Sequence, residues 1–222
     1  MTRRLALFDL DNTLLAGDSD HAWGEFLISK NLVDESKHRA ENDKYHQQYQ
    51  DGKLDIDAYV KFTLSPILEF SISERKQLHE DFMREAVVPM ISEAAQALVK
   101  SHKTAGDCCV IITATNEYIT APIARTFQVD QLLATDLEVV NGQYTGNISG
   151  IPCFQTGKVE KLNQWLRLRN DCLRIDESVF YSDSVNDLPL LNQVATPIVV
   201  DPDAGLREAA NNKGWDIISL RD

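Results

Sequence analysis

LALFDLDNTL (residues 5–14) decides the fold of this chain. Its apolar start predicts a short buried strand that delivers Asp9 to the strand's carboxyl end. Asp9 and Asp11 lie two residues apart there, so their carboxylates point to the same side and can share a divalent cation. Such a pair can also divide the roles of nucleophile and acid/base. A turn with solvated acids explains a lone Asp-x-Asp pair equally well, but the strand before Asp9 favours a functional pair.

Apolar runs elsewhere in the chain predict further strands of the same kind. These are Cys108–Thr113, Val179–Ser182, Pro197–Val200 and Asp216–Ile218. Helical patterns precede or follow them, at Ser92–Lys103, Tyr118–Phe127, Lys158–Arg169, Asp187–Asn192 and Ala204–Asn211. This alternation predicts an α/β fold, a Rossmann-like parallel sheet covered on both faces, with ligands at the carboxyl ends of the strands.

Two segments interrupt the alternation. Between Ala16 and Val87 the sequence consists of charged helical patches, so we expect an all-helical cap over residues 16–87 and a core formed by residues 1–15 and 88–222. The patches are His21–Lys30, Glu35–Gln50, Asp55–Leu68 and Ser73–Arg84, the last with Ser73 as its expected start. Within residues 136–150, Asn141-Gly142 separates alternating residues and predicts a small β-hairpin.

A second acidic cluster follows the predicted strand Val179–Ser182. Asp183 and Asp187 sit where a loop turns into a helix, and together with Asp9 they could hold Mg²⁺ through oxygen ligands. Asp187 alone is also a good residue for starting a helix. Two acidic strand ends in one sheet are harder to explain without a cation, because carboxylates this close repel one another.

Two further positions suit the oxygens of a phosphate group. Thr113 ends a predicted strand before a helix, so its hydroxyl and the neighbouring backbone N–H groups can donate to an anion, although an ordinary helix cap is equally consistent. Lys158 opens a helix, where the helix dipole disfavours a positive charge. An anionic target explains that position, and so does a solvated surface lysine.

Composition and charge narrow the classes of partner. With 43% hydrophobic and 25% charged residues, the chain is typical of a globular protein. Its formal net charge of -12 disfavours nucleic acid as a partner, since the field repels a polyphosphate backbone. No apolar stretch approaches the roughly 20 residues of a membrane helix, and the apolar run at residues 5–8 is too short for a signal peptide. We therefore expect a cytoplasmic protein with four reduced cysteines that pack as small buried residues.

Taken together, these motifs resemble the haloacid dehalogenase superfamily, and within it the phosphoserine-phosphatase-like branch (subfamily IB), whose helical cap of the C1 type follows the first strand. The resemblance covers Leu5 to about Trp215. Its motifs occur in the family's order, namely Asp9 to Thr13, then Thr113, then Lys158, then Asp183 with Asp187. Each motif alone is weak evidence, but the ordered set is specific.

The resemblance implies a role for each matching position in the Mg²⁺-dependent hydrolysis of small phosphate monoesters. Asp9 would be the nucleophile that becomes an aspartyl-phosphate, and Asp11 would protonate the leaving alcohol and then activate water. Phosphate would be bound by Thr113, the backbone of Ala114, Lys158 and Asn186. Mg²⁺ would be held by Asp9, the backbone carbonyl of Asp11, Asp183 and Asp187. A carboxylate attacking a phosphate dianion does need such positive charge beside it.

The substrate is less clearly indicated. Asp18 matches the acidic residue that reads the substrate amine in phosphoserine phosphatases, but Asp18 and Asp20 could equally start the first cap helix. Asn12 and residues 113–116 depart from that enzyme's pattern, and no cap arginine stands out as a reader of a carboxylate. The segment running into Trp23 resembles a bacterial subgroup that includes histidinol-phosphate phosphatases, which implies a role in amino-acid biosynthesis.

An acidic cap with aromatic residues could bind a cationic imidazole-amine, although the same aromatic residues could form the core of the cap. The residues in question are Trp23, Tyr45, Tyr49 and Tyr59. An amino-alcohol phosphate, histidinol phosphate first, is therefore the expected substrate, with phosphoserine as the alternative.

Two alternatives of other kinds remain. A phospho-accepting regulatory module would share the sheet and the acids, but it would not need the cap or Asp11. Phosphotransfer to an acceptor alcohol would replace hydrolysis by water. The sequence makes no prediction about oligomeric state.

Overall fold

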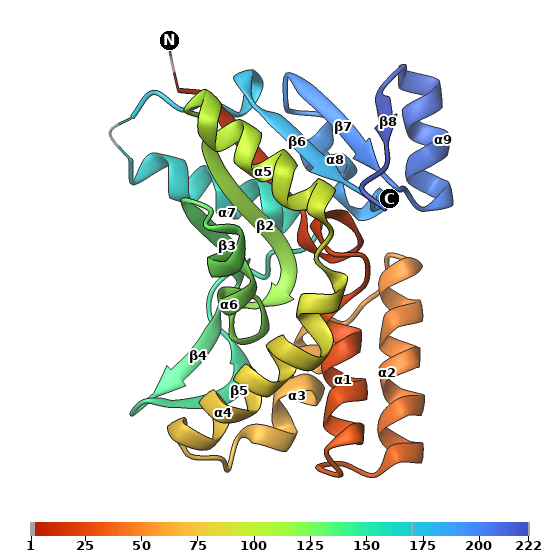
Figure 1. The fold of residues 1–222 in the computed structure, drawn as a ribbon, viewed down its shortest axis with the longest axis vertical. Helices are drawn as coiled ribbons and strands as arrows, with labels where there is room; N and C mark the ends of the chain where they lie inside the picture. The colour runs from red at the N-terminus through yellow and green to blue at the C-terminus, as the bar shows by residue number, and fades with distance from the viewer. Residues whose placement is uncertain (1–2, 170, 222) are drawn as a thin grey trace.

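The core is a parallel six-stranded sheet in a computed structural model that describes residues 3–169 and 171–221 (Figure 1). Its strand order is β3-β2-β1-β6-β7-β8. The strands are β1 Leu5–Phe8, β2 Cys108–Asn116, β3 Gln131–Thr135, β6 Val179–Ser182, β7 Thr196–Val200 and β8 Asp216–Ile218. The predicted α/β class with a parallel sheet is confirmed. Residues 1, 2, 170 and 222 of the predicted core lie outside the described residues.

Two features of the sheet differ from the sequence-based prediction. The edge strand β3 was not predicted, because Gln, Leu and Ala favour helices and the segment contains a single β-branched residue, Thr135. Strand β2 continues past Thr113 to Asn116, and its pairing with β3 shifts register between Ile112 and Asn116. The carboxyl end of β2 therefore extends further than its apolar run indicates.

Helices cover both faces of the sheet, as the buried strand β1 requires. Alternate residues of β1 enter opposite hydrophobic clusters, with Ala6 and Phe8 in one and Leu5 and Leu7 in the other. The first face is covered by α5 (Glu93–Ala105) and α6 (Glu117–Phe127). The second is covered by α7 (Thr156–Arg167), α8 (Leu188–Leu191) and α9 (Ala204–Lys213).

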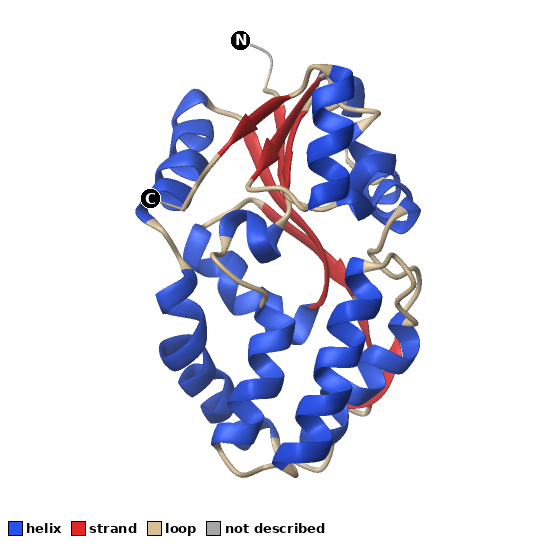
Figure 2. Cartoon of the chain, turned by 90° about the vertical axis from the view of Figure 1, so that its right-hand side faces the viewer, coloured by secondary structure: helices blue, strands red, loops and turns tan. Residues whose placement is uncertain are grey.

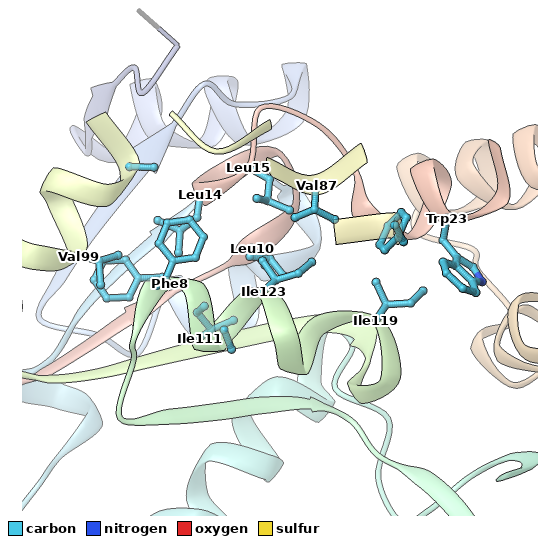
Figure 3. Packing of buried hydrophobic residues seen from close by; sticks show 14 of the residues in the cluster. Phe8, Leu10, Leu14, Leu15, Trp23, Val87, Val99, Ile111, Ile119 and Ile123 are labelled. Atoms are coloured by element: carbon cyan, nitrogen blue, oxygen red, sulfur yellow. The ribbon is translucent and has the colours of Figure 1, made fainter. Parts of the chain in front are cut away.

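A group of helices lies at one end of the sheet, below it in Figure 1 and again in the rotated view of Figure 2. It consists of α1 Ser19–Ser29, α2 Glu35–Gln50, α3 Ile56–Leu64 and α4 Ile72–Phe82, with a short helical turn at 65–67 between α3 and α4 and two more, 83–87 and 88–90, after α4. We call this group of helices, which lies where the sequence predicts an all-helical cap (residues 16–87) and ends just beyond it, the insert. The insert shares a hydrophobic cluster with the sheet, and Figure 3 shows that cluster extending from Phe8 and Leu10 past Ile119 to Trp23.

The fourth helix of the insert begins at Ile72, and its N-cap is Ser71, two residues before the predicted start at Ser73. Ser71 caps α4 by accepting a hydrogen bond from the Glu74 amide, and the Glu74 carboxylate accepts one from the Ser71 amide at 2.8 Å. This reciprocal capping box satisfies two amides that the start of a helix would otherwise leave without partners. Ser73 is thus inside the helix, and the predicted start was wrong by this margin.

The predicted hairpin is confirmed as β4 (Leu137–Val140) paired antiparallel with β5 (Gln143–Ile148). Asn141 and Gly142 both adopt positive φ, 52° and 78°, which a two-residue turn of this hand requires. Strand β5 contacts α3, so the hairpin lies against the helical insert.

All four cysteines are free, but only three of them are buried as expected. Cys108, Cys109 and Cys153 pack in the interior, whereas Cys172 is exposed because it lies in the loop after α7 rather than on a strand. None of the helices within residues 3–169 and 171–221 is long and apolar enough to cross a membrane.

Candidate active site

The carboxyl ends of three neighbouring strands bring the predicted site residues together. Strands β2, β1 and β6 are adjacent in the sheet, and they place Thr113, Asp9 and Asp183 at one edge. The Thr13 hydroxyl donates to Asp183 Oδ1 at 2.9 Å and lies 3.5 Å from Asp9 Oδ2, so it bridges two of these strand ends. This convergence follows from the parallel pairing alone, as the sequence predicts.

Lys158 lies at the centre of this cluster and is buried, with 1% of its surface exposed. Its Nζ donates to Asp9 Oδ1 at 2.8 Å, although 149 residues separate the two in sequence. Nζ also contacts both oxygens of Asp187, at 2.7 and 2.8 Å. Burial opposes the charge of Lys158, but Asp187 and Asp9 outweigh it and raise the lysine's pKa. The solvated-lysine interpretation is therefore wrong.

The backbone before Lys158 explains how the lysine reaches this position. Gly157 lies so close to the Pro152 carbonyl that an added Cβ would come within 2.0 Å of its oxygen. Only glycine permits this approach, which fixes where α7 begins and hence where Lys158 points. Ser182, the last residue of β6, donates to Asp187 Oδ2 at 2.7 Å and holds the other side of the ion pair.

Asp11 occupies a separate, fully polar environment next to Asp9. Its Oδ1 accepts the Ser19 amide at 2.7 Å, and its Oδ2 accepts the Thr115 hydroxyl at 2.8 Å. Burial, then the negative charge of Asp18, raises the pKa of Asp11 to about 7. Near neutral pH this carboxyl can therefore both give and take a proton.

The loop that carries Asp11 has an unusual backbone. Asn12 adopts a positive φ of 55°, a conformation that asparagine tolerates better than most residues, and its amide donates to the Gly17 carbonyl at 2.8 Å. The guanidinium of Arg221 donates to the carbonyls of Asn12 and Thr13. The loop is thereby held from a segment more than 200 residues further along the chain.

A cavity lies between Asp9 and the helical insert. From the core it is lined by Asp9, Asp11, Thr113, Ala114 and Thr115. From the insert it is lined by two acids, one histidine and three tyrosines, namely Asp18, Asp20, His46, Tyr45, Tyr49 and Tyr59, with Leu54, Ile56 and Val60 between them. The insert thus presents acidic and aromatic side chains to Asp9 across the cavity.

Comparison with known proteins identifies the family. The family model of the haloacid dehalogenase-like hydrolases matches residues 6–192. The chain belongs to this family. It is 45% identical to a histidinol-phosphatase of Neisseria meningitidis serogroup C (strain 8013) over 221 residues, which covers 99% of this chain and 100% of that relative. The predicted superfamily is confirmed.

Other relatives of this haloacid dehalogenase-like hydrolase agree with the predicted branch. A phosphoserine phosphatase of Mycobacterium tuberculosis (strain ATCC 25618 / H37Rv) is 32% identical over 97% of this chain and 70% of its own. A crystal structure of a protein with unknown function from Bordetella pertussis Tohama I superposes with a TM-score of 0.91 at 46% identity, covering 99% and 100% of the two chains. A substrate-bound phosphoserine phosphatase, 18% identical, shares the fold with a TM-score of 0.71 over 100% of this chain and 94% of that one.

The hydrolase's acids at the strand ends suit a divalent cation by their chemistry. Burial, then the charge of Asp9, raises the pKa of Asp183 well above its usual range, and burial raises that of Asp187 to about 6 although Lys158 lowers it. One ammonium thus faces three buried carboxylates, and a hard cation with oxygen ligands would offset the excess negative charge. No three His, Cys, Asp or Glu side chains of the described residues form a ready-made metal site, so the fit rests on donor chemistry.

Asn186 lies between the core and the insert of the hydrolase. Its amide nitrogen donates to the Tyr49 carbonyl at the end of α2 at 2.9 Å, and its amide oxygen accepts from Gln155 at 3.1 Å. Gln155 also donates to the Gly52 carbonyl at 3.3 Å. In this arrangement Asn186 ties the insert to the fourth motif, a contact that the sequence did not predict.

Trp23 does not take part in the cavity, although the sequence nominated it as a specificity residue. It is fully buried, packs against Phe26 and Phe82, and donates its indole N–H to the Thr63 carbonyl at 3.2 Å. The large apolar surface of a tryptophan on the inner side of α1 is better buried in the shared cluster than exposed in an acidic chamber. The nomination of Trp23 is corrected on this ground, while Asp18 and Asp20 do line the cavity.

Several supporting residues were given no role by the sequence analysis. Thr13, Thr115 and Ser182 each position one of the acids, although Thr13 belongs to the first motif and Ser182 directly precedes Asp183. Their proximity to the predicted aspartates was the available signal. Arg221 gave no such signal, because its contact with the first motif arises only when the last segment folds back onto it.

Proposed function

We propose that this hydrolase is a Mg²⁺-dependent phosphatase of small phosphate monoesters, with an amino-alcohol phosphate, histidinol phosphate first, as its substrate. The observation that carries the proposal is the contact of Lys158 with Asp9 at 2.8 Å beside Asp183 and Asp187. This arrangement offers a nucleophile, a positive charge and cation ligands in one place. With this substrate the enzyme would act in amino-acid biosynthesis in the cytoplasm.

Asp9 is the proposed nucleophile. Its carboxylate attacks the phosphorus atom, the alcohol leaves with a proton from Asp11, and the phosphoryl group remains on Asp9 as an aspartyl-phosphate. Asp11 then takes a proton from the attacking water, which releases phosphate and restores both residues. A pKa of about 7 suits a residue that works in both directions.

The remaining site residues bind the phosphoryl group and balance its charge. Thr113, the backbone N–H of Ala114 and Lys158 are assigned to the phosphoryl oxygens. Mg²⁺, when bound, neutralises charge that develops on the transferred group. Its proposed ligands are Asp9, Asp183 and the backbone carbonyl of Asp11. Asp187 has its oxygens near Lys158 and Ser182, so we assign it to holding the lysine.

The lining of the cavity favours a substrate with a cationic group and no carboxylate. Phosphoserine carries a carboxylate, which would face Asp18 and Asp20, and no arginine or lysine of the described residues lines the cavity. Histidinol phosphate has an amine and an imidazole instead, which suit acids and aromatic rings. The similarity to the Neisseria histidinol-phosphatase supports the same choice.

A screen of metabolite phosphates with Mg²⁺ tests the proposal. Histidinol phosphate is expected to give a kcat/KM at least about tenfold higher than phosphoserine or phosphoethanolamine, because it alone fills both the acidic and the aromatic part of the cavity. A chelator is expected to abolish the activity and added Mg²⁺ to restore it. Undiminished activity in chelator, or a preference for phosphoserine, would contradict the proposal.

The same screen separates the alternative functions. A phospho-accepting module would take up at most one phosphate per chain, so repeated turnover argues against it. Added acceptor alcohols reveal phosphotransfer as new phosphate esters among the products.

The pH dependence of the first step follows from Asp11. The leaving alcohol needs the proton of Asp11, whose pKa is raised to about 7. For an aliphatic ester we therefore expect kcat/KM to fall about tenfold per pH unit above pH ~7. 4-Nitrophenyl phosphate is the matched substrate, since its leaving group departs without a proton and should show a shallower decline. Identical profiles for the two esters would exclude Asp11 as the acid.

A further inference from the structure

Asp18 is already fully engaged within the protein. Its Oδ1 accepts the amides of Asp20 and His21, each at 2.9 Å, and thereby caps α1. Its Oδ2 lies 3.2 Å from His46 Nδ1. Burial tends to raise the pKa of Asp18, but the bonds from His46 and the His21 amide outweigh it, so the pKa is lowered. Both oxygens of this carboxylate thus have hydrogen-bond partners before any substrate arrives.

The hydrogen bond from His46 to Asp18 has a defined direction. The other ring nitrogen of His46, Nε2, lies 3.0 Å from the Gln50 amide nitrogen, which can only donate. Nε2 therefore accepts, and the ring proton resides on Nδ1, where it is donated to Asp18. Asp18 and His46 form a closed pair that joins α1 to α2.

Asp20, two residues further along, is in the opposite situation. It lines the cavity with 7% of its surface exposed, and the Thr63 hydroxyl donates to its Oδ1 at a long 3.5 Å. The Thr115 hydroxyl also acts on it by hydrogen bonding, so the groups of the described residues that favour its charged form are two neutral hydroxyls and no cation. Burial, then the charges of Asp18 and Asp11, raises the pKa of Asp20 well above its usual range. A buried carboxylate without a cation is costly, so its natural partner is a positive ligand.

Aromatic rings lie beside this carboxylate. Tyr59 lines the same cavity, and it lies one turn before Thr63 on α3, whose hydroxyl is 3.5 Å from Asp20 Oδ1. The rings of Tyr59 and Tyr45 are 5.0 Å apart and form one wall. An acid beside aromatic faces is a setting that favours an organic cation over a metal ion.

We infer that Asp20, and not Asp18, binds the cationic nitrogen of the substrate, with Tyr59 and Tyr45 as the adjoining aromatic wall. This assignment rests on the proposed function and sharpens it. The substrate class is a phosphate ester whose alcohol carries a protonated amine or imidazolium. Asp18 becomes a positioning residue, which holds the start of α1 so that Asp20 faces the cavity.

The test compares two substrates in Asp20→Asn. The ratio of kcat/KM for histidinol phosphate to that for 4-nitrophenyl phosphate is expected to fall by about 100-fold, the loss typical of one buried charge pair. Asp43→Asn is the matched control. It also replaces one aspartate by asparagine, but at an exposed position on α2 outside the cavity. That variant should keep the wild-type ratio. A wild-type ratio in Asp20→Asn would overturn the assignment.

The variant Asp18→Asn tests the alternative that Asp18 binds the cationic nitrogen. Removal of the charge at Asp18 weakens its bond with His46, so we expect a lower Tm and a ratio that falls by less than about tenfold. Asp20→Asn should not lower the Tm, because Asp20 has no cationic partner to lose. If the ratio of the two kcat/KM values falls about 100-fold in Asp18→Asn and keeps its wild-type value in Asp20→Asn, Asp18 binds the amine and the inference is wrong.

Binding of free histidinol distinguishes failure of the inference from failure of the proposed function. Wild-type protein should bind histidinol, and Asp20→Asn should bind it at least about 30-fold more weakly, while the affinity for inorganic phosphate serves as the reference. Equal binding by both proteins overturns the role of Asp20 alone. A wild type that neither binds histidinol nor hydrolyses its phosphate overturns both proposals together.

Discussion

Asp9→Asn is expected to lower kcat by about 10⁴-fold or more, because an amide oxygen is not a nucleophile toward phosphorus and the covalent route closes. The fold should remain, since asparagine has the same size and its amide oxygen can still accept from Lys158. Steady-state turnover of any phosphate ester measures the effect, and circular dichroism checks the fold.

A second readout makes the Asp9 experiment specific. Wild-type protein quenched in acid during turnover should carry an acid-stable, hydroxylamine-labile phosphate, and Asp9→Asn should carry none. Asp43→Asn is again the control for loss of one negative charge. Turnover of the Asp9 variant within tenfold of wild type would remove Asp9 from the role of nucleophile.

Lys158→Met is expected to damage both stability and catalysis. Methionine fills the space of the lysine stem but leaves Asp9 and Asp187 buried without their cation, and breaking such a buried pair typically costs about 3–5 kcal/mol. For a chain of this size that corresponds to a drop in Tm of roughly 10 °C. Turnover of the folded protein should fall by about 10³-fold, since the phosphoryl group loses its positive partner.

Lys161→Met separates the two effects. Lys161 lies one turn further along α7, is also buried, and pairs with Asp136 at 2.8 Å, just after β3 at the edge of the sheet, rather than with Asp9 or Asp187. Its loss should lower the Tm while the folded protein keeps its turnover. If the Lys158 and Lys161 variants lose turnover in equal measure at matched folded fractions, Lys158 has no special part in catalysis.

The convergence of the site was predictable from local sequence because parallel strands share one direction. Each of Asp9, Thr113 and Asp183 follows an apolar run, and parallel pairing alone brings such positions to one edge. The hairpin was predictable for a similar reason, since Asn141-Gly142 supplies the two positive φ angles of the turn. At the strand ends and at the hairpin turn, residues close together in sequence determine the structure.

The environments of the residues on α1 depend on tertiary packing. Trp23 and Asp20 both lie on α1, yet one enters the hydrophobic cluster and the other the cavity. Which side of a helix faces which surface depends on how α1 packs against α2 and α6, and a single segment does not encode that. The spacing of Asp18 from Asp9 makes it a candidate for binding the substrate amine, but its contact with His46 could not be predicted because that histidine comes from another helix.

The hydrogen bonds of Asn186 and Gln155 to the carbonyls of Tyr49 and Gly52 connect the insert to the fourth motif. Because Asn186 belongs to that motif, a ligand that breaks these bonds by separating the insert from the core would also disturb Asp183 and Asp187. A phosphorylated side chain on a protein surface brings a polypeptide with it, and these contacts lie in the path of such a chain. Under the proposed function, they would favour free metabolites over phosphoproteins as substrates.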